Sequence, residues 1–214
     1  MMKYKMVVFD LDGTILNTIG DLCSSVNEAL KTYSLPLIDI NQTKAFLGFG
    51  VKRLVELASN GDERLDELLK VFLKHYEAHY NDSTIPYNGI YDVINYCHDN
   101  NIKIGVLTNK VEEIAVDLCN AHFKNDFLFV YGDVVGRNRK PDPSMIYKIM
   151  SDYNIEKEEF LYIGDSEVDM KVSVNAGVDC ILLTYGFRNK EDLVKTFPYA
   201  CYVDKAIDII DYLK

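Results

Sequence analysis

The chain has 214 residues, of which 48% are hydrophobic and 26% are charged, and its formal net charge is -10. These proportions exclude a disordered chain, and the length is sufficient for one full hydrophobic core with a smaller lobe attached. A nucleic acid or an anionic membrane needs a basic protein face, so the acidic balance argues against both as partners. An anionic substrate must therefore be attracted by local cations.

The start of the chain and its cysteines bear on location. The only apolar run before Asp10 covers residues 6–9, which is too short for a signal peptide or a membrane span. The five cysteines are an odd number without a C-x-x-C pair, a pattern typical of reduced thiols rather than of disulfides or a zinc site. We expect a cytoplasmic protein that is a monomer or a small homo-oligomer.

The first predicted element is a strand over residues 6–9. Its apolar residues are continuous rather than alternating, which is typical of a strand buried on both faces of a parallel sheet. Apolar residues then recur every three or four positions over 16–33 and again over 65–80, and no strand-like run lies between these stretches. We predict an all-helical lobe, residues 16–83, inserted after the first strand.

Helices and strands alternate in the rest of the chain. We predict helices over 90–99, 111–121, 143–153 and 168–176, a short helix near Leu193 and a final helix, with strands over 102–107, 127–131, 160–163, 179–183 and 199–203. This alternation indicates an α/β fold with a doubly wound parallel sheet, built from residues 1–15 and 84–214.

Asp10 and Asp12 stand where the first strand ends. Residues two apart on a strand point to the same side, and a turn through Gly13 can aim both carboxylates at one reacting centre. One acid can then attack as a nucleophile, while the other protonates a leaving oxygen and later takes a proton from water. The alternative is an acid pair that only caps a turn.

A second pair of acids, Asp165 and Asp169, follows another apolar run. Because parallel strands end at one edge of a sheet, we expect this pair to lie near Asp10 and Asp12. Clustered carboxylates repel one another unless a cation matches them, and oxygen ligands without histidine or cysteine indicate Mg²⁺. Capping of the next helix by Asp165 or Ser166 is compatible with this role.

Two further segments offer groups that suit a phosphate. Thr108 and Asn109 follow a predicted strand just before a helix, where a hydroxyl and free N–H groups can hold phosphate oxygens, although both are also common helix caps. A fixed ammonium at Lys140 would offset charge on an attacking carboxylate and on a phosphoryl group. A solvated basic loop is the alternative, and we favour it for Arg137 and Arg139.

Taken in order, these segments resemble the four motifs of the haloacid dehalogenase superfamily. The matching positions are residues 9–14, Thr108 with Asn109, Lys140, and Gly164-Asp165 with Asp169. The resemblance spans the whole chain. It implies a Rossmann-like core with a helical cap domain inserted after the first motif.

Matched residue by residue, the resemblance implies a role for each position. Asp10 is the nucleophile, which forms an aspartyl-phosphate, and Asp12 is the general acid and base. The carboxylates of Asp10 and Asp165 and the backbone carbonyl of Asp12 hold Mg²⁺. The phosphoryl group is bound by Thr108, the backbone of Asn109 and Lys140, and the site is supported by Asp169, Ser166 and Thr14.

Asp12 also narrows the reaction. A halide leaves without a proton, whereas an alkoxide leaving group needs an acid, so Asp12 favours a phosphatase over a dehalogenase. We therefore predict Mg²⁺-dependent hydrolysis of a small phosphorylated metabolite. Segments 46–53 and 185–188 resemble phosphoglycolate phosphatases, although Asn17 departs from that pattern because members commonly carry Asp there.

Several other functions stay open at this point. Within the superfamily they are a nucleotide 5'-phosphatase, a pyrophosphatase and a sugar phosphomutase. A phosphoacceptor module of the receiver type also uses clustered acids, a threonine and a lysine on a doubly wound fold, but it has no need of an inserted helical lobe. The form of the phosphate product separates hydrolysis from these alternatives.

The helical lobe contains two weaker candidates. Gly48 and Gly50 could form a tight backbone loop over a substrate, with Lys52 or Arg53 reaching a carboxylate or a second phosphate. The alternative is a helix–helix turn in which the glycines only permit the bend. His75 and His79, four residues apart on a predicted helix, could ligate a metal, but amphipathic surface positions account for them equally well.

Overall fold

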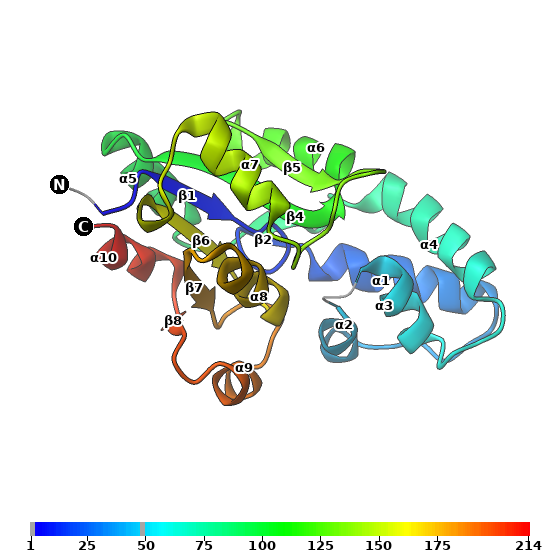
Figure 1. Cartoon of the computed structure of the whole chain (residues 1–214). Helices are drawn as coiled ribbons and strands as arrows, with labels where there is room; N and C mark the ends of the chain where they lie inside the picture. Colours follow the sequence, from blue (N-terminus) through cyan, green and yellow to red (C-terminus); the bar gives the residue numbers. More distant parts are fainter. Residues whose placement is uncertain (1–2, 48–49) are drawn as a thin grey trace. The chain divides into compact units, whose positions relative to one another are not determined.

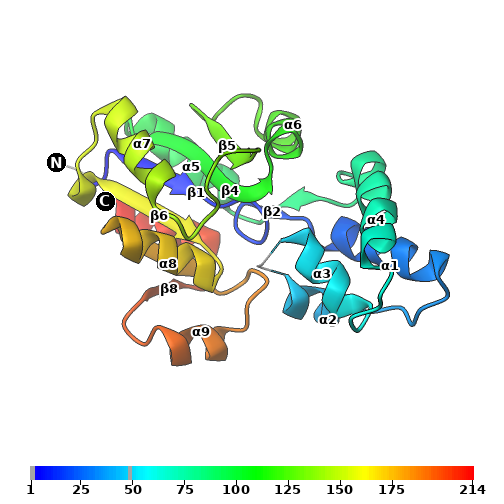
Figure 2. The same ribbon diagram turned by 45° about the vertical axis from the view of Figure 1, so that its right-hand side comes forward.

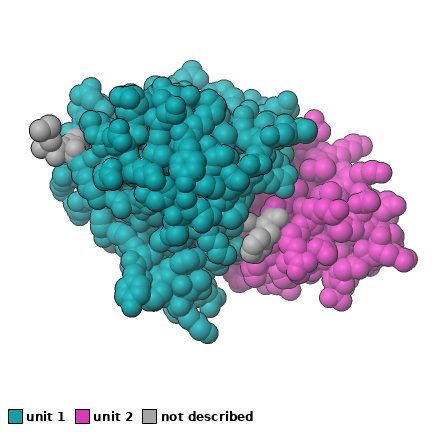
Figure 3. Space-filling view, in the orientation of Figure 1, with its two compact units in different colours: residues 1–16, 86–214 teal, residues 17–85 magenta. Residues whose placement is uncertain are grey.

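The computed structural model describes residues 3–47 and 50–214. The chain forms two compact units, residues 1–16 with 86–214 and residues 17–85 (Figure 3). The expected core comprised residues 1–15 and 84–214, and the expected helical lobe residues 16–83. That the second unit acts as a cap over a substrate stays a prediction.

The described residues of the larger unit form a parallel sheet (Figure 1). Its strands are β1 (Met6–Phe9), β4 (Lys103–Val111), β5 (Val130–Asp133), β6 (Phe160–Gly164), β7 (Asp179–Leu183) and β8 (Cys201–Val203). The order β5-β4-β1-β6-β7-β8 places β1 between β4 and β6, and Met6 lies opposite both Lys103 and Phe160. The predicted fold class, α/β with a doubly wound parallel sheet, is confirmed.

Helices cover both faces of this sheet, which explains the continuous apolar runs. They are α5 (Ile90–Asp99), α6 (Glu112–Phe123), α7 (Ser144–Tyr153), α8 (Glu167–Ala176), α9 (Lys190–Thr196) and α10 (Ile210–Leu213), with short 3-10 helices η1 (Lys157–Glu159) and η2 (Ala206–Ile209). Val8 packs into a core with Ile146 of α7 and Val172 of α8. Phe9, the next residue of β1, meets the edge of the Phe127 ring instead. Successive residues of β1 therefore fill two opposite cores.

The smaller unit is helical, as the apolar spacing predicted (Figure 2). It contains α1 (Ile19–Thr32), α2 (Ile40–Phe46), α3 (Val51–Ala58) and α4 (Leu65–His79), and α1 and α4 pack along each other. Two short paired strands, β2 (Leu16–Asn17) and β3 (Ile85–Pro86), contain the points where the chain passes between the units. No helix in the described part of the chain is long and apolar enough to cross a membrane.

Two local predictions were wrong. The first helix starts at Ile19 rather than near residue 16, because the chain first forms β2. The strand expected over 102–107 continues to Val111 as β4, so Thr108 lies inside a strand and not at a helix start. The short helices on either side of the glycine segment, α2 ending at Phe46 and α3 beginning at Val51, were not predicted. Helices of one or two turns leave too little periodicity to detect.

Candidate active site

The candidate site lies where three neighbouring strands end. Asp10 follows β1, Asp165 follows β6, and Thr108 lies in the last part of β4. The Asp10 N–H donates to the Ile163 carbonyl at 2.8 Å, so the β1–β6 ladder fixes the backbone of Asp10. In open parallel sheets this carboxyl edge is where ligands bind.

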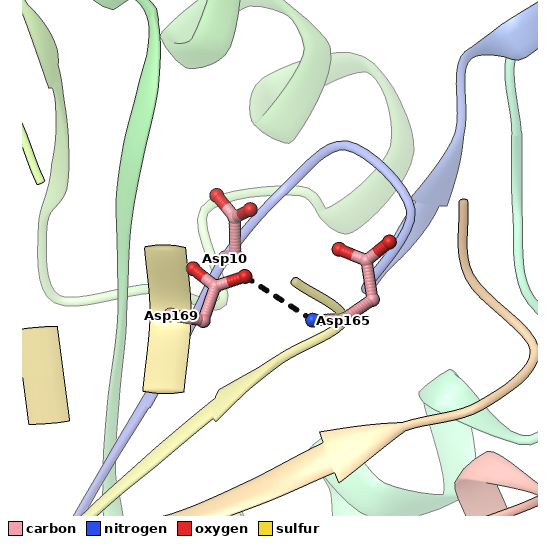
Figure 4. A group of neighbouring side chains, drawn as sticks. All are labelled: Asp10, Asp165 and Asp169. Atoms are coloured by element: carbon pink, nitrogen blue, oxygen red, sulfur yellow. Dashed lines mark hydrogen bonds between the residues drawn. The ribbon is translucent and has the colours of Figure 1, made fainter. Parts of the chain in front are cut away.

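Asp10, Asp165 and Asp169 form a buried cluster of carboxylates (Figure 4). One oxygen from each lies within 4.8 Å of the others, and the three residues are 9%, 2% and 0% exposed. The sequence named Asp10, Asp12 and Asp165 as metal ligands. In the structure, Asp169 rather than the Asp12 side chain completes the cluster. That the Asp12 carbonyl binds a metal stays a prediction.

Asp169 has both carboxylate oxygens engaged by protein donors. Oδ2 accepts from the N–H of Ser166 at 3.0 Å, from its hydroxyl at 2.6 Å and from the Asp165 N–H at 3.2 Å. Oδ1 accepts from Lys140 Nζ at 2.7 Å and from the Tyr162 hydroxyl at 3.4 Å. These contacts suit a supporting residue, which holds the first turn of α8 and Lys140 in place.

Asp165 is oriented by two donors. The Phe187 N–H donates to Oδ2 at 2.7 Å, and the buried Thr14 hydroxyl donates to Oδ1 at 3.3 Å. Gly13 makes room for this carboxylate: its φ is +82°, and a Cβ there would lie 2.4 Å from Asp165 Oδ2. Glycine is therefore required both for the turn after Asp12 and for the close approach of Asp165.

Lys140 is the cation of the cluster. Lys140 is only 7% exposed. Its Nζ lies 2.9 Å from Asp10 Oδ1, 2.7 Å from Asp169 Oδ1 and 2.9 Å from the Tyr162 hydroxyl. The Asn109 side chain holds the Lys140 backbone at two points, accepting from its N–H at 2.9 Å and donating to its carbonyl at 3.0 Å. Asn109 therefore positions Lys140 with its side chain, a contact that the sequence did not predict.

Asp12 lies outside the cluster and pairs with another lysine. Lys110 Nζ donates to Asp12 Oδ1 at 2.9 Å and to Oδ2 at 3.2 Å. The Thr108 hydroxyl, which is almost fully buried, accepts from the Lys110 N–H at 3.3 Å. The structure thus brings Thr108, Asn109 and Lys140 to the edge of the sheet that carries Asp10.

The cluster carries an excess of negative charge. Burial raises the pKa of Asp10 to about 6, because the loss of solvent outweighs the nearby Lys140 charge. Burial, followed by the charges of Asp169 and Asp10, raises the pKa of Asp165 well above its usual value. Desolvation lowers the pKa of Lys140, but the charges of Asp10 and Asp169 outweigh it and raise that pKa well above the ordinary value.

The donor set fits a small divalent cation. When all three carboxylates are ionised, as metal binding requires, the single ammonium leaves two negative charges to be matched. Asp10 Oδ1 is buried and has no aligned hydrogen-bond donor among the described residues, although Lys140 Nζ is near. Buried carboxylate oxygens without nitrogen or sulfur ligands are typical of Mg²⁺ sites.

The weaker candidates lie in the smaller unit. Gly50, with φ at +85°, precedes α3, and Lys52 and Arg53 lie in the first turn of that helix. Arg53 pairs with Glu56 at 2.7 Å. Gly48 lies outside the described residues. A substrate-binding role for this segment stays a prediction.

The two histidines of α4 have contacts other than a metal. His75 Nδ1 lies 3.0 Å from the Ser25 hydroxyl, and His79 Nδ1 lies 2.8 Å from an Asp82 oxygen. Their rings stack at 4.3 Å. Within residues 3–47 and 50–214 no third metal-ligating side chain joins them.

Sequence reasoning gave no role to Lys110 or Tyr162. Lys110 directly follows Thr108 and Asn109, so a basic residue beside a predicted phosphate site was the available signal. Tyr162 is two residues before Gly164 on β6, and its hydroxyl donates to the Leu107 carbonyl at 2.7 Å. A hydroxyl in an otherwise apolar buried strand needs a partner, which was the signal in that case.

Comparison with known proteins identifies the family. The model of the haloacid dehalogenase-like hydrolase family matches residues 7–183, which is most of the chain. The chain therefore belongs to this family of hydrolases, as its motifs predicted.

Several relatives resemble this chain along most of its length. Phosphoglycolate phosphatase 1 of Pseudomonas aeruginosa is 28% identical over 215 residues, covering 96% of this chain and 78% of the relative. Pyrophosphatase PpaX of Halalkalibacterium halodurans is 29% identical and covers 98% of this chain and 97% of the relative. A solved structure of a candidate phosphoglycolate phosphatase from Lactobacillus delbrueckii subsp. bulgaricus has a TM-score of 0.90 at 29% identity, covering 99% of both chains.

Mg²⁺ is expected to stabilise the folded chain through this cluster. At about 100 times its Kd, Mg²⁺ should contribute about 2.7 kcal/mol, and the Tm of a chain of this size should rise by about 5 to 11 °C. Asp165→Asn should remove most of the rise, because it removes a carboxylate from the cluster. Asp99→Asn, at an exposed position in α5, is the matched control and should keep it. An equal rise in the Asp165 variant would contradict the assignment.

The raised pKa of Asp10 predicts a pH dependence of the metal-free chain. In the folded chain, the Asp10 carboxyl keeps its proton up to about pH 6. In the unfolded chain, the same carboxyl releases its proton near pH 4. The contribution of Asp10 to stability therefore falls as pH rises through this window, by at most about 1.4 kcal/mol per pH unit. In EDTA, the Tm of Asp10→Asn should exceed that of the wild type by a margin that grows from about pH 4 to pH 7. A margin independent of pH would contradict this.

Proposed function

We propose that this chain is a phosphatase that hydrolyses small phosphate monoesters, with Mg²⁺ as cofactor, through an aspartyl-phosphate on Asp10. The observation that carries the proposal is the setting of this carboxylate. It is buried at the carboxyl edge of the sheet, and its Oδ1 lacks an aligned donor among the described residues while Lys140 Nζ lies 2.9 Å away. A carboxylate that only capped a turn would have its oxygens on backbone N–H groups.

Asp10 and Asp12 have different roles in the proposed reaction. In the first step, an Asp10 oxygen forms a bond to phosphorus as the ester P–O bond breaks, and the Asp12 carboxyl gives its proton to the departing alkoxide. In the second step, water attacks the phosphorus, its proton passes to the Asp12 carboxylate, and the bond between Asp10 and phosphorus breaks. The sum is ester plus water to alcohol plus inorganic phosphate, and both carboxyls return to their starting forms.

Other residues of the edge would bind the cation and the phosphoryl group. The carboxylates of Asp10 and Asp165, with the Asp12 carbonyl, would hold Mg²⁺. Asp169 suits this less well, since its oxygens accept from five protein donors whereas those of Asp165 accept from two. When bound, Mg²⁺ neutralises charge on the transferring phosphoryl group. The phosphoryl oxygens would be bound by the Thr108 hydroxyl, the Asn109 backbone and Lys140.

The names of the relatives support two substrate classes. Phosphoglycolate is the first candidate, because the relative from Pseudomonas aeruginosa and the structure from Lactobacillus are described by that activity. Pyrophosphate is the second, because PpaX matches this chain over 97% of its own length. Both leave an oxygen that the proposed acid, Asp12, can protonate.

Asp10→Asn should abolish turnover, because an amide cannot replace the attacking carboxylate. We expect phosphate release to fall by at least about 10⁴-fold, the scale seen when a catalytic nucleophile is removed. Asp99→Asn is again the matched control and should keep full activity. Near-normal release by the Asp10 variant, prepared without contact with wild-type enzyme, would refute the covalent mechanism.

A substrate panel tests the proposed function itself. We expect phosphate release in Mg²⁺ that stops in EDTA when the enzyme meets phosphoglycolate, sugar phosphates, nucleoside monophosphates and pyrophosphate. Release concentrated on phosphoglycolate supports the first substrate class, and release concentrated on pyrophosphate supports the second. Transfer between positions of a sugar phosphate without free phosphate would indicate a mutase. A stable phosphorylated protein without turnover would indicate a phosphoacceptor module.

A further inference from the structure

Lys110 contacts both carboxylate oxygens of Asp12. The proposed reaction gives Lys110 no role. The two distances, 2.9 and 3.2 Å, show that Nζ lies against both oxygens and so restrains the direction of the carboxylate. The Lys110 side chain is 5% exposed, whereas that of Asp12 is 24% exposed. A buried ammonium therefore holds a carboxylate that still faces solvent.

An irregularity in β4 places Lys110 there. Leu107 lies opposite Tyr131 and Val111 lies opposite Asp133, so the three residues between them on β4 face Gly132 alone. This is a β-bulge, which re-aims side chains near functional sites. Lys110 lies within this bulge, directly before Val111, where the pairing with β5 resumes.

The neighbouring edge strand supports the bulge. A Cβ on Gly132 would lie 2.5 Å from the Lys110 carbonyl oxygen and 2.5 Å from the Glu112 Cα, so only glycine lets the two backbones meet. The Gly132 N–H donates to Glu112 Oε2 at 3.0 Å, and Arg137 pairs with the same carboxylate. The position of Lys110 is thus built into the backbone and does not depend on a flexible side chain alone.

Lys110 and Lys140 divide the charges of the site. Lys140 pairs with Asp10 and Asp169, whereas Lys110 pairs with Asp12. A cation that only balanced the cluster would lie among its carboxylates, as Lys140 does. The separate pairing indicates that the carboxylate of Asp12 needs a fixed direction of its own.

We propose that Lys110 is a positioning residue that holds the Asp12 carboxyl in the direction required for proton transfer. The inference rests on the proposed function, in which Asp12 protonates the leaving alkoxide. Proton transfer by a positioned acid contributes about 10² to 10⁴-fold, and a displacement of about 1 Å can cost about 10²-fold. Substrates whose leaving group needs no proton should not depend on Lys110 in the step that releases it.

The test compares kcat/KM on three esters, because this ratio reports the steps up to release of the first product. Ethyl phosphate needs an acid and has no carboxylate, phosphoglycolate needs an acid and has one, and p-nitrophenyl phosphate releases a phenolate that needs little protonation. Lys110→Met should lower kcat/KM by about 10 to 100-fold on the two alkyl esters and by less than about threefold on the aryl ester. Lys110→Arg, which can keep a two-point contact with a carboxylate, should recover much of the loss.

Two controls accompany these variants. Lys148→Met removes an exposed lysine that pairs with Asp152 at 2.6 Å, and it should change none of the three ratios. A rise in Tm with Mg²⁺ shows that the Lys110 variants are folded. Should Lys110→Met fail to fold, Lys110→Gln, which keeps a shorter neutral donor, allows the same comparison.

Each other outcome overturns the inference in its own way. Equal losses on all three esters would mean that Lys110 only supports the fold. A loss confined to phosphoglycolate would mean that Lys110 binds the substrate carboxylate. Unchanged ratios would mean that the pairing with Asp12 is not used. Failure of the wild type to release phosphate from these esters and from every member of the substrate panel, pyrophosphate included, would instead refute the proposed function, on which the inference rests.

Discussion

The pairing of Lys140 with Asp10 and Asp169 is the interaction on which the site depends. Buried charges are costly unless they are paired and hydrogen-bonded, and here one ammonium meets two of three clustered carboxylates. The pairing lowers the free-energy cost of burying these carboxylates, but it does not neutralise the cluster. The remaining negative charge suits a divalent cation, and the ammonium beside Asp10 suits a phosphoryl group. Both expected ligands therefore follow from one imbalance of charge.

Backbone geometry brings these groups together and keeps them apart from Asp12. The order β4-β1-β6 sets the ends of three strands side by side, and the Asn109 side chain fastens the Lys140 backbone to the end of β4. Lys110, which lies within the bulge of β4, pairs with Asp12. Two carboxylates only two residues apart in sequence thereby receive different cations and different surroundings. Asp10 lies beside Lys140 in the buried cluster, whereas Asp12 is held by Lys110 and stays partly exposed.

Much of this could be predicted from the sequence, because it depends on local patterns. Continuous apolar runs ending in Asp10 and Asp165 indicate parallel strands that meet at one edge, and the spacing in α1 and α4 indicates a helical unit. The β4 bulge could not be predicted, since a change of register depends on the partner strand and on the close approach at Gly132. The roles of Lys110 and of the Asn109 side chain depend on that bulge and on a loop distant in sequence. Short helices such as α3 carry too few periodic positions to be detected.

In the proposed mechanism, Asp10 receives the phosphoryl group. To test this step directly, the enzyme is mixed with Mg²⁺ and an ester whose phosphate group is radiolabelled. The reaction is quenched with acid within one turnover. Peptide mass spectrometry then identifies the labelled residue. Label is expected on the Asp10 side chain, within the peptide that carries it, and it should disappear when unlabelled substrate is added before the quench. Steady release of phosphate without labelled protein, or label on another residue, would contradict it.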